Sequence, residues 1–192
     1  MGKVLEELQR ADFKITSAVF HSVGAGGYLG DKAARALWEC VSLSADGLLW
    51  FGAAPLHLLA SAGWRVSPSL LTPTASLVAS GLLCDIAVIV SLKFAFKRKR
   101  PPFHKPDARF VGVDVHSFPS GHATRCWCLV ALLGSLHPHH APLLAAWGLL
   151  VSLSRVALGR HYVSDVVAGS LVGFFCTAPA AAWALGAARR AA

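Results

Sequence analysis

The residue types best suited to chemistry gather in three polar clusters that interrupt apolar segments. The clusters read KFAFKRKRP at residues 93–101, PSGH at residues 119–122 and SRVALGRHYVSD at residues 154–165. Together they supply lysines, arginines, histidines, serines and a carboxylate. Cations suit an anionic ligand, and an imidazole can exchange a proton or attack an electrophile near neutral pH. This combination favours the binding and transfer of an anionic group.

The third cluster predicts a nucleophilic histidine. His161 and Asp165 are four residues apart, so they share one face if HYVSDVVAGS is helical. A carboxylate on one imidazole nitrogen fixes the tautomer, leaves the other nitrogen free to attack, and stabilises the cation that follows. We therefore take His161 as the candidate nucleophile and Asp165 as the residue that orients it.

The second cluster predicts a helix that begins at a ligand. Pro119 disfavours helix for the residue before it, Ser120 is a favourable N-cap, and Gly121 lets a ligand approach the backbone. The unpaired N–H groups of such a helix start can bind an anion. His122 falls in the first turn, where it could give a proton to a leaving oxygen.

The remaining candidates are cations. Lys93, Arg100 and Arg155 supply positive charge, and the two guanidinium groups can each bind two phosphate oxygens. The cations of the run between the first two are expected instead to lie at the membrane interface and meet lipid headgroups. They are Lys97, Arg98 and Lys99.

A second group of histidines, in the sequence HPHH, raises the alternative of a metal site. His137, His139 and His140 have no acidic residue nearby. They also fall on the opposite side of the predicted membrane topology from the three polar clusters. An exposed turn is therefore the better interpretation, and we predict no metal site.

The elements that must position these residues are predicted to be membrane helices. Of the 192 residues, 55% are hydrophobic, which exceeds the usual share in a soluble domain. Five apolar stretches approach the ~17–25 residues that a membrane-crossing helix needs; they cover about residues 44–64, 74–92, 121–136, 143–158 and 163–185. We predict an all-α integral membrane bundle of five to six helices, with the three polar clusters on one side.

The N-terminal region differs from the rest. Residues 4–24 repeat apolar positions at helical spacing between charged ones, which predicts an amphipathic helix on the membrane surface or an imperfect sixth span. We therefore divide the chain into an amphipathic segment, 1–30, and a membrane-embedded domain, 31–192. Two acids lie within apolar stretches: Asp46 near an interface, and Asp85 at mid-span, where it must be neutral or paired.

Charge excludes one class of partner. The chain has 18 Lys and Arg against 10 Asp and Glu, a formal net charge of +8. The basic block at residues 93–109 is tied to apolar spans rather than to a motif that reads a nucleic-acid groove. Its partners are expected to be the lipid bilayer and an anionic substrate, with no nucleic acid.

Taken together, the clusters resemble the three signature motifs of the type 2 phosphatidic acid phosphatase, or lipid phosphate phosphatase, superfamily. Those motifs are K-x6-R-P, P-S-G-H and S-R-x5-H-x3-D, and every fixed position is matched here. The longer sequences around the second and third motifs, SFPSGHATR and LGRHYVSDVVAGSLVG, are most similar to those of the polyisoprenoid diphosphate, or presqualene diphosphate, phosphatases. The implied fold is the helical core that this superfamily shares with vanadium haloperoxidases.

The resemblance implies a role for each matched residue. His161 would attack phosphorus to form a phosphohistidine, Asp165 would orient it, and His122 would protonate the leaving group and later activate water. The phosphoryl oxygens would be held by the remaining motif residues, which are Lys93, Arg100, Ser120, Gly121 and Arg155. The family needs no Mg²⁺. Similar proteins also suggest the endoplasmic reticulum membrane.

Three functions therefore remain open on the sequence. The first is a membrane phosphatase of isoprenoid diphosphates and monophosphates, or more broadly of phosphatidate, lysophosphatidate or sphingosine 1-phosphate. The second is a catalytically silent membrane scaffold, against which the intact His122, His161 and Asp165 argue. The third is a vanadium haloperoxidase, a class that is typically soluble, unlike this apolar chain.

Overall fold

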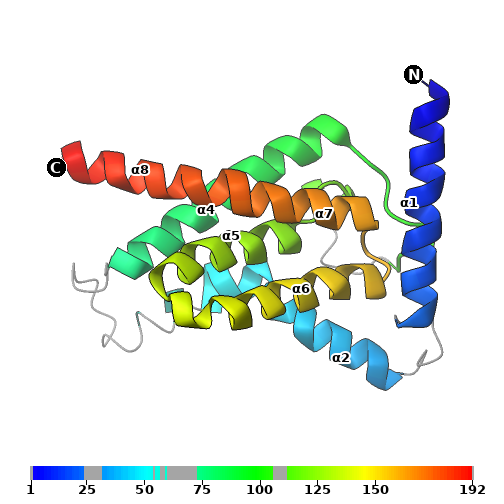
Figure 1. The fold of residues 1–192 in the computed structure, drawn as a ribbon, viewed down its shortest axis with the longest axis horizontal. Coiled ribbons are helices and arrows are strands. Elements are labelled where there is room, and N and C mark those ends of the chain that lie inside the picture. Colours follow the sequence, from blue (N-terminus) through cyan, green and yellow to red (C-terminus); the bar gives the residue numbers. More distant parts are fainter. Residues whose placement is uncertain are drawn as a thin grey trace.

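The regular elements of the structure, a computed structural model, are all helices. The structure describes residues 2–23, 32–53, 55–56, 59, 73–105 and 112–191. Within them, five helices form the bundle shown in Figure 1; they are α4 (Pro73–Phe96), α5 (Gly121–Leu136), α6 (Ala141–Ala157), α7 (Val163–Val172) and α8 (Ala178–Ala191). The predicted all-α bundle is confirmed.

Helix α5 is the centre of this bundle. It packs against α4, α6, α7 and α8, and its residues Ala123, Cys126 and Leu129 are completely buried. A helix that is apolar on all sides is stable only when other helices surround it. The start of α5 at Gly121 is therefore fixed by the packing of the rest of the helix.

Close packing of α7 against α5 depends on glycine. A Cβ added to Gly169 would lie 2.7 Å from the Ser120 carbonyl oxygen, and one added to Gly173 would lie 2.2 Å from that of Thr124. Because both obstacles are backbone atoms, no side-chain adjustment could relieve them. These two glycines bring the third polar cluster against the second.

The end of α7 continues without a break in the helical backbone. A π-helical segment, η5 (Gly173–Thr177), joins α7 to α8. The predicted fifth stretch, residues 163–185, is thus one continuous helical segment that extends to residue 191.

Three of the described helices are long and apolar enough to cross a membrane. They are Thr74–Phe96, Pro138–Ala157 and Val163–Trp183, which correspond to the predicted second, fourth and fifth stretches. The third stretch forms α5, whose 16 residues fall short of that length. The first stretch lies partly outside the described residues, so the total of five to six spans stays a prediction.

The start of the first predicted stretch differs from a simple span. The chain forms α2 (Lys32–Leu43), turns, and then forms a π-helical segment, η1 (Leu49–Ala53). Helix α2, which was not predicted, packs on α6. The turn places Asp46 between these two elements, a position that matters for the site below.

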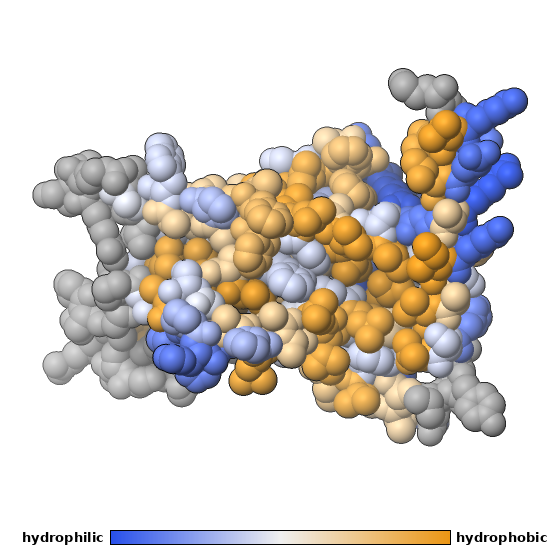
Figure 2. All heavy atoms as spheres, in the orientation of Figure 1, coloured by the Kyte–Doolittle hydropathy of each residue, from blue (hydrophilic) through white to orange (hydrophobic). Residues whose placement is uncertain are grey.

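The outer surface of the bundle is apolar. Leu83 of α4, Leu143 of α6 and Phe175 of η5 are 68%, 71% and 66% exposed, and Figure 2 shows apolar residues across the long helices. Several fully buried residues are polar or charged instead, among them Asp85. This arrangement suits a lipid environment, in which polar groups must find partners inside the protein. Of the two states expected for Asp85, neutral or paired, the structure shows a pair, since Arg125 lies 3.3 Å from it.

Helix α1 (Gly2–Ser22) runs across one end of the bundle, beside the start of α7 (Figure 1). Its charged side lies along the outer edge of the molecule and its apolar side chains lie on the other side of the helix (Figure 2), where Leu8 and Ile15 stay 62% and 55% exposed. The predicted amphipathic helix is therefore present. Its place on a membrane surface, and the boundary between 1–30 and 31–192, stay predictions.

Candidate active site

A cavity of about 510 Å³ brings the three polar clusters together. It opens at the end of the bundle where α4 ends and α5 begins. Six of the eight predicted site residues line it; they are Lys93, Arg100, Gly121, His122, Arg155 and His161. The other two, Ser120 and Asp165, are fully buried behind this lining.

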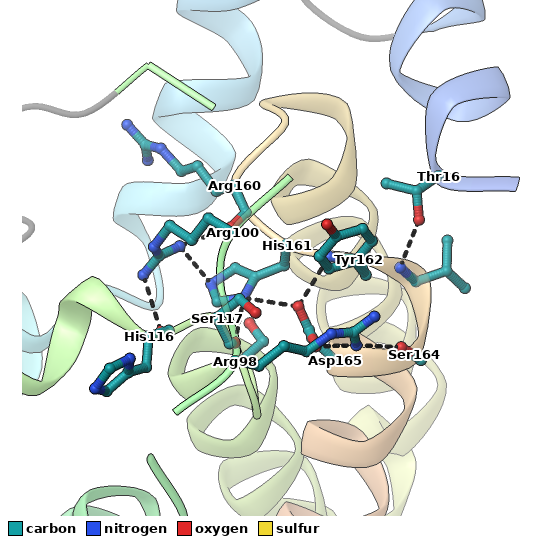
Figure 3. A network of polar contacts seen from close by, with 12 residues as sticks. Thr16, Arg98, Arg100, His116, Ser117, Arg160, His161, Tyr162, Ser164 and Asp165 are labelled. Atoms are coloured by element: carbon teal, nitrogen blue, oxygen red, sulfur yellow. Dashed lines mark hydrogen bonds and ion pairs between the residues drawn. The ribbon is translucent and has the colours of Figure 1, made fainter. Parts of the chain in front are cut away.

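His161 lies in the loop between α6 and α7. Its Nδ1 is 2.8 Å from the carbonyl oxygen of Ser117 and 3.7 Å from Oδ2 of Asp165 (Figure 3). Because a carbonyl oxygen only accepts, Nδ1 carries the proton. The other nitrogen, Nε2, is then unprotonated and accepts a hydrogen bond from Nη1 of Arg100 at 3.3 Å. Its lone pair becomes available to an electrophile when Arg100 turns to bind the anion instead.

The predicted helical register of His161 and Asp165 is wrong in one respect. Helix α7 begins at Val163, so His161 precedes it and Tyr162 is the N-cap. Asp165 sits in the first turn and accepts a hydrogen bond from the Tyr162 N–H at 2.9 Å. Asp165 therefore fixes the backbone beside His161, while the Ser117 carbonyl fixes its ring. The main-chain acceptor gave no signal in the sequence.

Burial keeps the His161 ring neutral. Its side chain is 2% exposed, and burial, followed by the charges of Arg100 and Arg155, lowers the pKa of His161 well below its usual value. A neutral imidazole is the nucleophilic form. The same charges that would bind an anion thus also keep the nucleophile ready.

Ser120 occupies the predicted N-cap of α5. Its backbone is extended, but its side chain makes no cap hydrogen bond; the peptide bond between Phe118 and Pro119 is cis. The buried Ser120 Oγ has no hydrogen-bond partner among the described residues. A buried hydroxyl without a partner is costly unless a ligand satisfies it.

His122 has a carboxylate neighbour that the sequence did not reveal. Its Nε2 lies 3.4 Å from Oδ2 of Asp46, and both residues line the cavity. The other oxygen of Asp46 accepts a hydrogen bond from the Leu48 N–H at 2.9 Å. Asp46 was predicted only to lie near an interface, because nothing in its local sequence points to a residue of α5.

Two of the cations are bound to the segment that precedes α5. Lys93, 1% exposed, donates to the His116 carbonyl at 2.7 Å and lies 3.3 Å from Oδ1 of Asp114. Arg100 donates to the Asp114 carbonyl at 3.2 Å and to the Arg160 carbonyl at 2.6 Å. Both cations therefore shape the wall of the cavity, including the short helix η3 (Gly112–Val115).

Arg155, the third predicted cation, is buried without a carboxylate partner among the described residues. It is 2% exposed, donates to the Ser42 hydroxyl, and forms no ion pair among the described residues. Its Nε has no hydrogen-bond partner there either. Such a cation in a cavity favours an anionic ligand.

Arg98 corrects the prediction for the basic run. Lys97 and Lys99 are exposed as expected, but Arg98 turns inward. Its Nη1 donates to Oδ1 of Asp165 at 2.6 Å (Figure 3), and its Nη2 donates to Oδ2 of Asp12 at 2.8 Å. Directly after α4, Lys97 has φ 46°, which gives the chain a sharp change of direction that the run of basic residues did not indicate.

The cavity also has an apolar wall. Ile86, Ile89 and Val90 of α4 line it together with Leu48, and Lys93 lies on the same side of α4 one turn further along. An elongated apolar group could therefore lie on this wall while an anionic group reaches the cations.

The histidines outside the cavity lie where the sequence placed them. His137, His139 and His140 are exposed and stand at the opposite end of α5 from His122, around the short helix η4 (Pro138–His140). Within the described part of the chain, no group of three or more His, Cys, Asp or Glu residues could hold a metal ion.

Comparison with known proteins gives one family. The family model of the PAP2 superfamily matches residues 70–189. A probable lipid phosphate phosphatase beta of Arabidopsis thaliana is 31% identical over 48% of this chain and 57% of its own length. A lipid A 1-phosphatase of Rhizobium johnstonii is 36% identical over 51% of this chain and 41% of its own. The chain thus spans about half the length of these curated relatives.

Two solved structures share the fold. The crystal structure of Aquifex aeolicus LpxE superposes with a TM-score of 0.62 at 19% identity, covering 87% of this chain and 92% of that one. A transmembrane PAP2 type phosphatidylglycerolphosphate phosphatase from Bacillus subtilis superposes with a TM-score of 0.66 at 22% identity, covering 94% and 87%.

Proposed function

Since the chain belongs to the PAP2 superfamily, we propose that it is a membrane phosphatase that removes phosphate from a lipid through a phosphohistidine. The observation that carries this proposal is the position of His161. Its unprotonated Nε2 lies beside Arg100, in a cavity that Lys93 and Arg155 also line. A neutral nucleophile among cations is suited to attack on a phosphoryl group.

In the first step, His161 Nε2 attacks phosphorus and the bond to the leaving oxygen breaks. His122 donates its proton to that oxygen, so that an alcohol or a phosphate leaves. Asp46, 3.4 Å from His122, stabilises the protonated imidazole before transfer. The Nδ1 proton of His161 stays on the ring, directed at the Ser117 carbonyl.

In the second step, water attacks the phosphohistidine. His122, now neutral, takes a proton from that water, and the P–N bond breaks to release phosphate and restore His161. Lys93, Arg100 and Arg155, with Ser120 and the Gly121 N–H, hold the phosphoryl oxygens throughout. These charges do the work that Mg²⁺ does in other phosphatases, and the reaction proceeds without a metal cofactor.

The substrates that we propose are isoprenoid diphosphates and monophosphates, such as presqualene, farnesyl and geranylgeranyl diphosphates. The apolar wall of Ile86, Ile89 and Val90 beside the cations supports an apolar tail joined to an anionic head. Phosphatidate, lysophosphatidate and sphingosine 1-phosphate have the same two parts and are the alternative. The membrane that we propose is that of the endoplasmic reticulum.

The test is phosphate release by the purified protein in detergent, with EDTA present, beside His161→Ala. Farnesyl diphosphate, presqualene diphosphate, phosphatidate and sphingosine 1-phosphate are compared. Release that resists EDTA and is lost in the variant supports the mechanism, and preference for a diphosphate supports the isoprenoid substrates. No release from any substrate, where a relative is active, would favour the silent scaffold instead.

A further inference from the structure

Helix α1 carries a carboxylate on its apolar side. Asp12 falls between Leu8 and Ile15, which are 62% and 55% exposed, yet the Asp12 side chain itself is 12% exposed. Thr16, one turn along, is completely buried. A carboxylate on the apolar side of a helix is costly unless it has charged or hydrogen-bonding partners.

The partners of Asp12 and Thr16 are the unpaired N–H groups at the start of α7. The Val163 N–H donates to Thr16 Oγ1 at 3.0 Å (Figure 3), and the Ser164 N–H donates to Asp12 Oδ1 at 3.0 Å. The Ser164 hydroxyl donates to Asp12 as well. The first turn of α7, which contains Asp165, is thus capped by side chains of α1.

Asp12 has a second contact that Thr16 lacks. Its Oδ2 accepts from Arg98 Nη2 at 2.8 Å, while Arg98 Nη1 donates to Asp165 Oδ1 at 2.6 Å. One guanidinium therefore bridges two carboxylates. It also stacks over the Tyr162 ring, with Cζ 4.0 Å from the ring centroid. The pKa of Arg98 is raised by this pairing despite its burial, so the bridge stays charged.

We propose that Asp12 is a positioning residue for the phosphoryl transfer. It holds Arg98 by one side of the guanidinium, so that only the other side binds Asp165. Asp165 then keeps its second oxygen for the Tyr162 N–H, which fixes the backbone that carries His161. This inference rests on the proposed function. It adds a residue outside the three motifs to the machinery that aligns the nucleophile.

Removing the charge of Asp12 is expected to misalign His161 rather than to weaken substrate binding. Without the Asp12 charge, Arg98 keeps its hydrogen bonds to Ser164 Oγ, at 2.7 Å, and to Asp165. Its Nη2 loses the ion pair, so the guanidinium can turn to offer both nitrogens to Asp165, which shifts the carboxylate away from the Tyr162 N–H. Misplacement of a reacting group by about 1 Å can cost ~100-fold in rate. The cations that contact the phosphoryl group are unchanged, so KM should change little.

The experiment compares Asp12→Asn with two matched controls. Thr16→Ala removes the neighbouring contact of α1 with α7 and leaves the bridge intact, and Glu6→Gln makes the same chemical change on the exposed side of α1. We expect Asp12→Asn to lower kcat about 10- to 100-fold with KM within about threefold, and both controls to keep kcat within about threefold. The loss in Asp12→Asn/Arg98→Gln should equal that in Arg98→Gln alone.

A second readout does not depend on hydrolysis. The ¹⁵N NMR signals of the His161 ring are assigned as those that disappear in His161→Asn. At pH 7 their chemical shifts should change in Asp12→Asn and stay unchanged in Thr16→Ala. Unmoved shifts, an equal loss of kcat in Thr16→Ala, or additive losses in the double variant would overturn the inference. If the wild-type protein releases no phosphate, the proposed function fails, and the ring shifts alone decide the role of Asp12.

Discussion

Asp46 and His122 lie side by side in the lining of the cavity, with the Asp46 carboxylate 3.4 Å from the His122 ring. The two come from separate elements, the turn after α2 and the first turn of α5. A carboxylate beside an imidazole stabilises its protonated form, which is the form that a general acid needs. Burial and the charge of Arg155 oppose that form in the free protein. A bound anionic substrate would add its negative charge to that of Asp46, so in the complex this pair would set the pH at which the leaving group can still be protonated.

The first prediction concerns this pair. In Asp46→Asn the amide oxygen can still accept from the Leu48 N–H, but the charge is gone. His122 then gives up its proton at a lower pH. The alkaline limb of the plot of kcat against pH therefore shifts to lower pH, and kcat at neutral pH falls about 10-fold or more. The measurement is kcat from pH 5 to pH 9. An unchanged alkaline limb would remove Asp46 from the mechanism, and Glu6→Gln serves as the control for overall charge.

The second prediction concerns the acidic limb. His161 is nucleophilic only when neutral, and its pKa in the folded protein lies below the ordinary value because of burial and the nearby arginines. As pH falls, the ring therefore stays neutral past the point where a free histidine, with pKa about 6.5, is protonated. The acidic limb of kcat/KM should lie well below pH 6.5. A limb at the ordinary histidine value would show that the ring is solvated in the free enzyme.

Packing of α7 on α5 gives the third prediction. A Cβ at Gly173 would meet the Thr124 carbonyl oxygen at 2.2 Å, whereas one at Gly52 meets nothing within 4 Å. Gly173→Ala should lower the free energy of unfolding by about 1–3 kcal/mol, or about 2–4 °C in Tm for each kcal/mol. Thermal unfolding in detergent, with Gly52→Ala as the matched control, measures the difference. Equal Tm values would show that α7 can move away from α5.

A fourth prediction uses the buried pair of Asp85 and Arg125. Their side chains are 0% and 11% exposed and lie 3.3 Å apart. Arg125→Met leaves the Asp85 carboxylate buried without its partner, which should cost about 3–5 kcal/mol. The double variant Asp85→Leu/Arg125→Met removes both charges and should recover most of the stability. A double variant less stable than Arg125→Met in thermal unfolding would contradict this account.

Sequence could place the residues whose chemistry is carried by their own type and spacing. His122, His161, Arg100 and Arg155 were predicted to meet, and they line one cavity, because each motif adjoins an apolar segment that fixes its depth. The helical spacing of apolar residues between charged ones was likewise sufficient to predict α1 as an amphipathic helix. The burial of Asp85 required a partner inside the bundle, and Arg125 is that partner.

The sequence could not supply contacts between segments far apart in the chain. Arg98 looks like its neighbours Lys97 and Lys99, and only the fold brings Asp12 and Asp165 to it. The Ser117 acceptor is a main-chain carbonyl, which every residue has, so residue type carries no information about it. The same holds for Asp46, whose partner His122 belongs to a different helix.

The wall formed by Ile86, Ile89 and Val90 ends at Lys93, seven residues from Ile86, which is about 10 Å along a helix. The wall therefore has a fixed and short length. A tail lying along it would contact this wall over about two helical turns, and carbons further from the phosphate would lie beyond it. Selectivity at this wall would therefore depend on the shape of the tail next to the phosphate, and tails that share this first segment would bind it alike whatever their length.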